Sequence, residues 1–286
     1  MAASPNHAGT QRTLERLRAH WEVERELAQR LLAADRQERS RLYGQLYDEL
    51  FQRVPDHPQL VRRRDPAAHR AQIAEQESMV KRFLAPGETL LEVGAGDCAL
   101  SLALAAYAGR VYAVEVSEEI APAGALPENV SLLVTDGRSI PVDPGTVDVV
   151  YSNQLMEHLH PEDAREQLQN VFAALRAGGR YICLTPNRLL GPSDISQYFE
   201  PETASGFHLR EYSQTELRAI LLQAGFARVD TLVTWGAAAA KAPIAPVLVA
   251  ERVFGALPRR VRLRVKRWRV VRRILHPGGG VVATKG

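Results

Sequence analysis

The sequence has little cysteine and lacks both a long apolar run and a secretory start, and each absence excludes a class of protein. Its two cysteines, Cys98 and Cys183, stand in apolar stretches, which favours buried free thiols over a disulfide or a metal pair. No segment approaches the ~18 continuous apolar residues of a membrane-spanning helix. No basic start precedes an apolar run, so we expect no signal peptide. We therefore predict a cytoplasmic protein whose contact with a membrane, if any, is peripheral.

The 286 residues, 45% of them hydrophobic, suffice for one domain with additions. Residues 1–9 are small and polar, and we predict that they are disordered. Between residues 10 and 51 leucines recur at helical spacing, which predicts two helices, and Asp65-Pro66 predicts the start of another. We assign residues 1–85 to an N-terminal helical extension that either shapes a ligand pocket or only packs on the core. Residues 86–286 form the main domain.

From residue 89 onward short apolar strands alternate with amphipathic helices, a pattern typical of a parallel sheet with helices on both faces. We expect strands at 89–93, 110–116, 131–136, 147–153, 180–186, 226–234 and 281–285. We expect helices at 97–107, 161–176 and 212–224. Residues 237–277 interrupt this alternation, so we interpret them as an insertion before the final strand.

A glycine turn follows the first of these strands. Because Gly94 and Gly96 have no Cβ, the backbone can turn tightly and a ligand can approach it. The layout is typical of a dinucleotide site, with Glu115 as the later acidic residue, or of an S-adenosylmethionine site. Glu92 favours the second ligand, because a carboxylate repels a pyrophosphate but attracts a sulfonium and an ammonium group. Two opposite charges ~4 Å apart attract each other by about 4 kcal/mol at an effective dielectric constant of ~20.

Five stretches together resemble the motifs of class I S-adenosylmethionine-dependent methyltransferases. They are Leu91-Glu92-Val93-Gly94-Ala95-Gly96, Val111-Tyr112-Ala113-Val114-Glu115, Val134-Thr135-Asp136-Gly137, Asp148-Val149-Val150-Tyr151-Ser152-Asn153 and Leu175-Arg176-Ala177-Gly178-Gly179-Arg180-Tyr181. Cys98 departs from the pattern, since many members have a third glycine there. The resemblance covers about residues 86–235. It implies an α/β fold with a Rossmann-like, seven-stranded, mostly parallel sheet, helices on both faces and an antiparallel last strand.

The resemblance also implies S-adenosylmethionine as the cofactor. Its methionyl end would lie by Glu92, the glycine turn and Asn153, its ribose by Glu115, and its adenine by Asp136. We therefore predict eight cofactor-binding residues: Glu92, Gly94, Ala95, Gly96, Glu115, Asp136, Gly137 and Asn153. The carboxyl ends of parallel strands meet at one edge of a sheet, which would bring these residues together.

Three candidate catalytic residues follow the fourth and fifth strands. Glu157-His158 is common at this point in the class, and His158 would act as a base or orient the acceptor, unless it only pins the loop by hydrogen bonds. The long polar and aromatic stretch 185–212 predicts an acceptor-binding loop, and His208 within it is the rival base. Some members bind a metal through two carboxylates and histidines here. Because Gln154 stands in place of the first carboxylate, we predict no metal site.

The insertion is strongly basic. Residues 251–275 include ten Arg or Lys residues and one acidic residue, which gives a local charge of +9 in a chain of net charge +3. Val261, Val265, Trp268, Val271 and Leu275 predict one helical stripe that starts after Pro258. A basic amphipathic helix indicates peripheral membrane contact or an anionic lipid-like acceptor, although a helix docked by its stripe with solvated arginines fits equally. Sparse aromatic residues argue against nucleic acid.

These features lead to one hypothesis and three alternatives. We predict a methyltransferase that uses S-adenosylmethionine and acts on an oxygen of a small-molecule or lipid-linked acceptor. The alternatives are an N-methyltransferase of a small amine, an NAD-dependent oxidoreductase, and a non-catalytic protein that binds the cofactor or a membrane. The oxidoreductase is disfavoured by Glu92 and by the absence of its catalytic half after residue 150.

Overall fold

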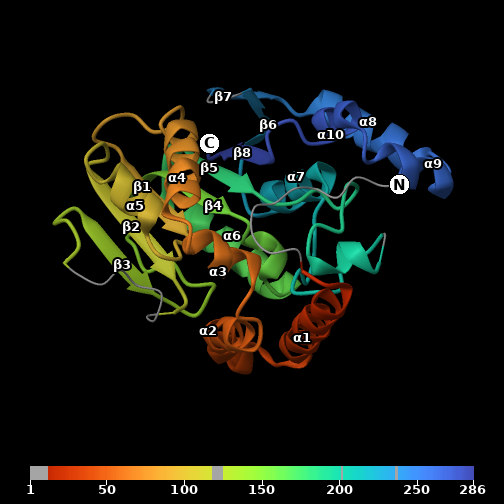
Figure 1. Cartoon of the computed structure of the whole chain (residues 1–286). Coiled ribbons are helices and arrows are strands. Elements are labelled where there is room, and N and C mark those ends of the chain that lie inside the picture. The colour runs from red at the N-terminus through yellow and green to blue at the C-terminus, as the bar shows by residue number, and fades with distance from the viewer. Residues whose placement is uncertain (1–11, 118–124, 201, 236–237) are drawn as a thin grey trace.

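A single sheet forms the centre of the computed structural model, which describes residues 12–117, 125–200, 202–235 and 238–286 (Figure 1). The segment predicted to be disordered, residues 1–9, lies outside this part of the chain. The sheet has eight strands. In chain order they are β1 (Thr89–Val93), β2 (Arg110–Glu115), β3 (Val130–Val134), β4 (Val147–Asn153), β5 (Leu175–Leu184), β6 (Arg228–Trp235), β7 (Ala238–Pro243) and β8 (Gly280–Thr284).

The strands lie in the order β3-β2-β1-β4-β5-β8-β6-β7. The pairings among β1 to β5 are parallel, and β8 runs antiparallel to both β5 and β6, as predicted for the last strand. The predicted count of seven strands was wrong. β7, inside the presumed insertion, pairs antiparallel with β6. Its run of alanines has low strand propensity and no alternating pattern, so no sequence signal predicts this strand.

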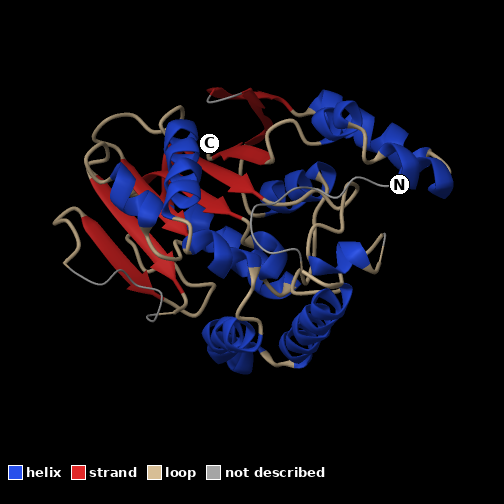
Figure 2. Ribbon diagram, in the orientation of Figure 1, coloured by secondary structure: helices blue, strands red, loops and turns tan. Residues whose placement is uncertain are grey.

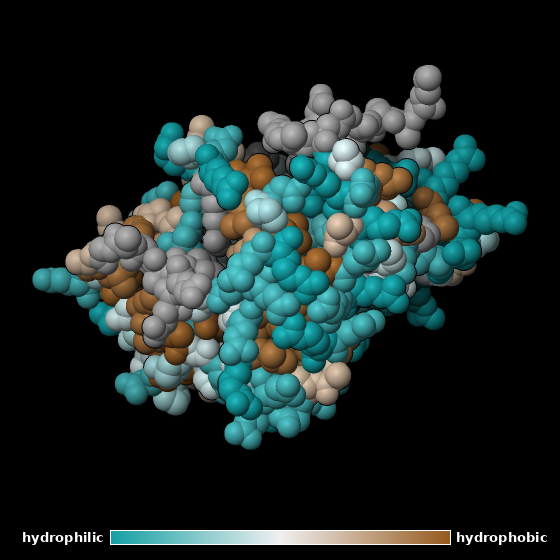
Figure 3. Space-filling model, turned by 60° about the horizontal axis from the view of Figure 1, so that its bottom comes forward, coloured by the Kyte–Doolittle hydropathy of each residue, from teal (hydrophilic) through white to brown (hydrophobic). Residues whose placement is uncertain are grey.

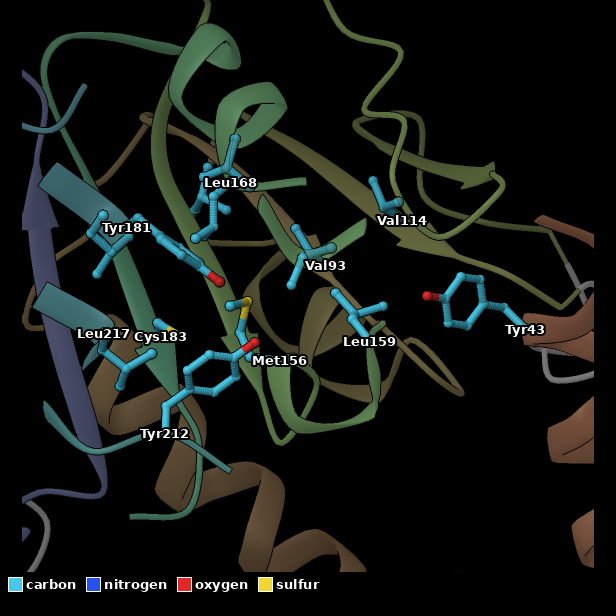
Figure 4. Close-up of a cluster of buried hydrophobic side chains, with 14 of the residues drawn as sticks. Tyr43, Val93, Val114, Met156, Leu159, Leu168, Tyr181, Cys183, Tyr212 and Leu217 are labelled. Atoms are coloured by element: carbon cyan, nitrogen blue, oxygen red, sulfur yellow. The ribbon is translucent and has the colours of Figure 1, made fainter. Parts of the chain in front are cut away.

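Helices cover both faces of the sheet (Figure 2). Successive strand residues point to opposite faces, so Leu91 and Tyr181 join the core under α6 (Pro161–Ala174) and α7 (Gln214–Gln223). Leu90 and Ile182 join the core under α4 (Pro66–Val80) and α5 (Ala99–Leu104). Figure 4 shows the first core, where Tyr181 and Cys183 of β5 lie between Leu168 of α6 and Leu217 of α7. Both cysteines are free and buried, as predicted.

The N-terminal helices form the two-helix pattern predicted for residues 10–51. They are α1 (Leu14–Ala33) and α2 (Arg36–Arg53), followed by the short α3 (Pro58–Arg63). Asp65 caps α4 with Pro66 in the first turn, also as predicted. Leu27, Leu31 and Leu46 are fully buried in the core that α6 and α7 share. In Figure 3, which brings α1 and α2 to the front, hydrophilic side chains dominate the surface.

The basic segment is divided into three helices, and the prediction of one continuous stripe was wrong. They are α8 (Ala245–Ala256), α9 (Arg259–Val265) and α10 (Arg269–Leu275). The chain turns at Trp268, so Val265, Val271 and Leu275 pack with Phe254 while Trp268 stays exposed. In the part of the chain that the structure describes, no helix is both long and apolar enough to cross a membrane.

A buried ion pair joins the N-terminal helices to the sheet layer. Arg39 of α2 and Asp163 of α6 are both almost fully buried, with Nε and Oδ2 2.7 Å apart. The hydroxyl of Tyr43 donates a further hydrogen bond to the same carboxylate at 2.7 Å. Burial acts to raise the pKa of Asp163, but these two partners hold it below its usual value.

Removing this charge pair should destabilise the protein more than removing an exposed pair between the same helices. Asp163→Asn removes the buried counter-charge of Arg39 and leaves it only the exposed Glu162 carboxylate, so we expect the free energy of unfolding to fall by about 3 kcal/mol. Arg36 and Glu166 form the matched exposed pair between α2 and α6, and Glu166→Gln should cost about 0–1 kcal/mol. Chemical denaturation measures both values, and equal losses would contradict this account.

Candidate functional site

A cavity of about 290 Å³ lies at the carboxyl ends of β1, β2 and β4. Parallel pairing places these ends at one edge of the sheet, as expected. Of the predicted cofactor residues, the lining includes all but one: Glu92, Gly94, Ala95, Gly96, Glu115, Gly137 and Asn153. The exception is Asp136.

The turn after β1 takes a left-handed backbone at three positions. Gly94 has a φ of +75° and Gly96 a φ of +56°. A Cβ on Gly94 would lie 3.2 Å from the Leu155 side chain, so a larger residue would fill the cavity there. Cys98 also has a positive φ, 59°, a backbone conformation that favours glycine.

The Glu92 carboxylate lies at the floor of the cavity and is almost fully buried. Burial raises the pKa of Glu92 to about 8, although the Ser101 hydroxyl donates a hydrogen bond to Oε2 at 2.6 Å. No cationic side chain among the described residues pairs with this buried carboxylate. It would gain a counter-charge from a cationic ligand group placed beside it.

Glu115 ends β2 on the opposite wall of the turn. Its two carboxylate oxygens accept hydrogen bonds from the backbone N–H groups of Gly96 and Val116, each at 2.7 Å. A carboxylate has about four lone-pair positions, so Glu115 keeps acceptor capacity for ligand hydroxyls. Asn153 ends β4 and lines the same cavity.

Asp136 does not face the cavity. Its Oδ1 accepts hydrogen bonds from the backbone N–H groups of Arg138 and Ser139, and its Oδ2 accepts from the Arg138 guanidinium at 2.8 Å. These contacts turn the carboxylate toward the protein, and Thr135 and Gly137 line the cavity in its place. The predicted contact of Asp136 with adenine therefore gains no support from the geometry.

Helices α2, α3 and α4 supply residues that the sequence reasoning did not identify. From α2, Tyr43, Tyr47 and Phe51 line the cavity. Their four-residue spacing puts three aromatic rings on one helix face, and this was the available signal. The lining from α3 and α4 consists of Gln59, His69, Gln72, Ile73 and Gln76.

His158 lines the cavity and is held in one tautomer. Its Nδ1 lies 2.9 Å from the Phe207 carbonyl oxygen, and because a carbonyl only accepts, Nδ1 carries the hydrogen and Nε2 keeps a lone pair. Burial, together with the charge of His208, lowers the pKa of His158 to about 3. The ring is therefore neutral at physiological pH and presents a hydrogen-bond acceptor.

Glu157 and His208 stand behind His158 rather than in the lining. One Glu157 oxygen accepts a hydrogen bond from Thr185 at 2.9 Å, and the other has no partner among the described residues. Burial raises the pKa of Glu157 to about 7. The His208 ring lies 4.9 Å from the His158 ring and shares a hydrogen bond with Glu211. Burial acts to lower the pKa of His208, but the nearby Glu211 and Glu157 carboxylates raise this pKa above its usual value.

Within the described part of the chain, two groups of side chains have a composition that could bind a metal. Ligand atoms of Glu157, His158 and His208 lie within 4.8 Å of one another, as do those of His20, Glu24 and His57. Gln154 belongs to neither group. His57 is buried and its ring packs against Phe51. The members of both groups already make hydrogen bonds within the protein, and the predicted absence of a metal stays a prediction.

The peptide of Phe207 connects the N-terminal extension to His158. Its N–H donates to Glu24 of α1 at 2.9 Å, while its C=O accepts from His158. Glu24 is itself held by His20, with Nε2 2.6 Å from Oε1. Burial acts to raise the pKa of Glu24, but the partners His20 and His57 hold it well below its usual value.

Comparison with known proteins agrees with this geometry. Residues 91–183 match the model of a methyltransferase domain. A probable S-adenosylmethionine-dependent methyltransferase of Mycolicibacterium smegmatis is 32% identical over 147 residues, which are 51% of this chain and 54% of that protein. One of Mycobacterium tuberculosis is 29% identical over 158 residues, 54% of this chain and 55% of that protein. The chain thus spans about half the length of the curated relatives it matches.

Solved structures also share this fold, and one of them is taken as an example. It comes from the complex between the Haloferax volcanii Trm112 methyltransferase activator and a methyltransferase. The TM-score is 0.50 at 18% identity, and the alignment covers 78% of this chain and 92% of that chain.

Replacing Glu24 should loosen the Phe207 peptide. In Glu24→Gln the buried charge that accepts the Phe207 N–H is lost, so we expect the unfolding free energy to fall by about 2–3 kcal/mol and the Phe207 amide to exchange its hydrogen faster. Hydrogen exchange resolved to single residues measures this. The control is Glu26→Gln, on the same helix as Glu24, which removes an exposed ion-pair partner of Arg53. An unchanged Phe207 amide in Glu24→Gln would contradict the link.

Proposed function

We propose that this chain, which carries a class I S-adenosylmethionine-dependent methyltransferase domain, transfers a methyl group to a hydroxyl oxygen of a small-molecule or lipid-linked acceptor. One observation carries the choice of a hydroxyl. His158 lines the cavity as a neutral ring whose Nδ1–H is bound by the Phe207 carbonyl. Its Nε2 is thus available to accept the proton of a hydroxyl, which is the acceptor group that needs a base, whereas an amine needs only to arrive unprotonated.

The residues around the glycine turn fit S-adenosylmethionine. Glu92 would hold the cationic methionyl end, because its buried carboxylate has no cationic partner in the described part of the chain. Glu115 would accept the ribose hydroxyls with its remaining lone pairs. When bound, the cofactor supplies a methyl group on a sulfonium, which is an excellent leaving group. This fit supports S-adenosylmethionine over the dinucleotide of an oxidoreductase, because Glu92 would repel a pyrophosphate.

The protein's own part is to orient the acceptor, exclude water and receive one proton. Aromatic side chains of α2 and the buried floor of the turn surround the reaction space, and alignment of reactants can lower a barrier by several kcal/mol. A bound cofactor would supply the methyl carbon and leave as a neutral thioether when the bond from that carbon to sulfur breaks, and the acceptor oxygen would become strongly acidic as it bonds to the carbon. His158 Nε2 then takes the hydroxyl proton, and even a base with a pKa of about 3 suffices at that stage.

Cofactor affinity should depend on the protonation of Glu92. With a pKa of about 8, Glu92 is mostly protonated below neutral pH and lacks the charge that attracts an ammonium group. Between pH 5.5 and 7.5, where the cofactor's amino group stays largely protonated, we expect the affinity to rise with pH, by up to tenfold per unit. Calorimetric titration with S-adenosylmethionine measures it.

Glu92→Gln should flatten this profile and weaken binding at pH 7.5 by on the order of 100-fold. Glu77→Gln on α4, outside the cavity lining, is the control and should keep the slope of the wild-type protein. A pH profile that persists in Glu92→Gln would assign the titration to another group.

Replacing His158 should separate proton acceptance from cofactor binding. His158→Gln should leave the dissociation constant for S-adenosylmethionine within about twofold, while turnover falls by about 10²–10⁴-fold, the usual range for loss of a proton acceptor. His160→Gln, which removes only the N-cap of α6, is the control. Turnover is measured as transfer of an isotope-labelled methyl group from the cofactor to acceptors in a cell extract that is incubated with the protein.

Mass spectrometry of that incubation also tests the class of reaction. Label on a hydroxyl-bearing product supports the proposal, and label on an amine product, with His158→Gln still active, would support N-methylation. If the protein binds the cofactor but no extract yields a labelled product, the protein would be a non-catalytic binding protein.

A further inference from the structure

The surface of α8, α9 and α10 carries a dense positive charge. We call residues 245–275 the C-terminal helical module. Its arginines are mostly exposed: Arg252, Arg259, Arg260, Arg264, Arg267, Arg269, Arg272 and Arg273. Among the described residues, Arg259 is the only one of these eight that forms an ion pair, with Glu202. The module's single acid, Glu251, is buried and binds Asn187, Gln214 and Thr215.

Large apolar side chains stand exposed between these arginines. Val249 and Val253 lie one turn apart on α8 and are 63% and 60% exposed. Val270 and Ile274 lie one turn apart on α10 and are 68% and 51% exposed, and Trp268 precedes them at 56%. The inward residues of the module already pack together around Phe254 and Leu275. The exposed set is therefore additional to the apolar surface that holds the module to the protein, and together with the arginines we call it the exposed face of the module.

We propose that this face docks on an anionic lipid membrane. Exposed valine, isoleucine and tryptophan side chains gain by entering the headgroup region, and arginines around them gain by pairing with lipid phosphates. The absence of an exposed acid among residues 245–275 favours a partner that is negatively charged throughout. A nucleic acid would pair with the arginines but would leave the valines and Ile274 in water.

The module is also joined to the segment that follows β5. Leu189 and Leu190 pack in its core, the Lys266 amine donates to the Gly191 carbonyl at 2.6 Å, and Asn187 donates to the Leu275 carbonyl at 3.0 Å. This same segment continues to Phe207 and His208. Docking would thus hold the acceptor side of the cavity at the lipid surface. This placement of the acceptor side rests on the proposed function, whereas the docking itself does not rest on it.

Vesicle flotation with the full chain tests the docking. We expect binding to vesicles that contain phosphatidylglycerol, weak binding to pure phosphatidylcholine, and release at high salt, where exposed charges are screened. Arg264→Glu with Arg267→Glu should weaken binding to anionic vesicles by at least about 25-fold, since each basic residue near the surface contributes roughly fivefold. Arg16→Glu with Arg41→Glu, two exposed arginines on α1 and α2, is the matched control.

A second pair of variants tests the apolar part. Val253→Ser with Ile274→Ser should weaken vesicle binding by at least about tenfold, and Leu32→Ser, an exposed leucine on α1, should not. Equal binding to neutral and anionic vesicles, or equal losses in the control variants, would overturn the proposal. So would tight binding to a DNA duplex with none to vesicles. Methyl transfer to a water-soluble acceptor by these variants reports on the proposed function separately.

Discussion

Parallel pairing of β1 with β2 and β4 is the constraint on which the whole site depends. The register sets Val93 beside Val114 and Ser152, so the residues just beyond each strand end meet at one edge. Glu92, Glu115 and Asn153 therefore share a cavity although more than sixty residues separate the first from the last. The left-handed turn at Gly94 and Gly96 keeps that edge open, because the backbone leaves the sheet there without a side chain to fill the gap.

Much of the fold was predictable because its signals are local. Strand ends near residues 93, 115 and 153 follow from apolar runs that stop at a polar or glycine residue, and the capping box at Ser213 marks the start of α7. The errors fall where local signals are weak. Alanine-rich β7 has no alternation, and the break at Trp268 between α9 and α10 has neither a proline nor a glycine to mark it.

The site was predictable where strand topology determines it and less so elsewhere. Sequence reasoning identified Glu92 and Glu115 because each ends a central strand. It did not identify Tyr47 or Phe51, since the packing of α2 over the cavity depends on long-range pairs such as Arg39 with Asp163. It also placed Asp136 toward the ligand, whereas the neighbouring Arg138 draws that carboxylate away. A side chain with a strong local partner is the hardest to orient from sequence.

The two cysteines have a practical consequence. Both are fully buried, and burial raises the pKa of each thiol to about 12. Since the thiolate is the species that reacts with maleimides and oxidants, the native thiols of the folded protein stay inert near neutral pH. A cysteine engineered into the exposed surface of α10 would then be the only reactive one. A fluorophore attached there could report the orientation of that helix without removing Cys98 from its left-handed turn.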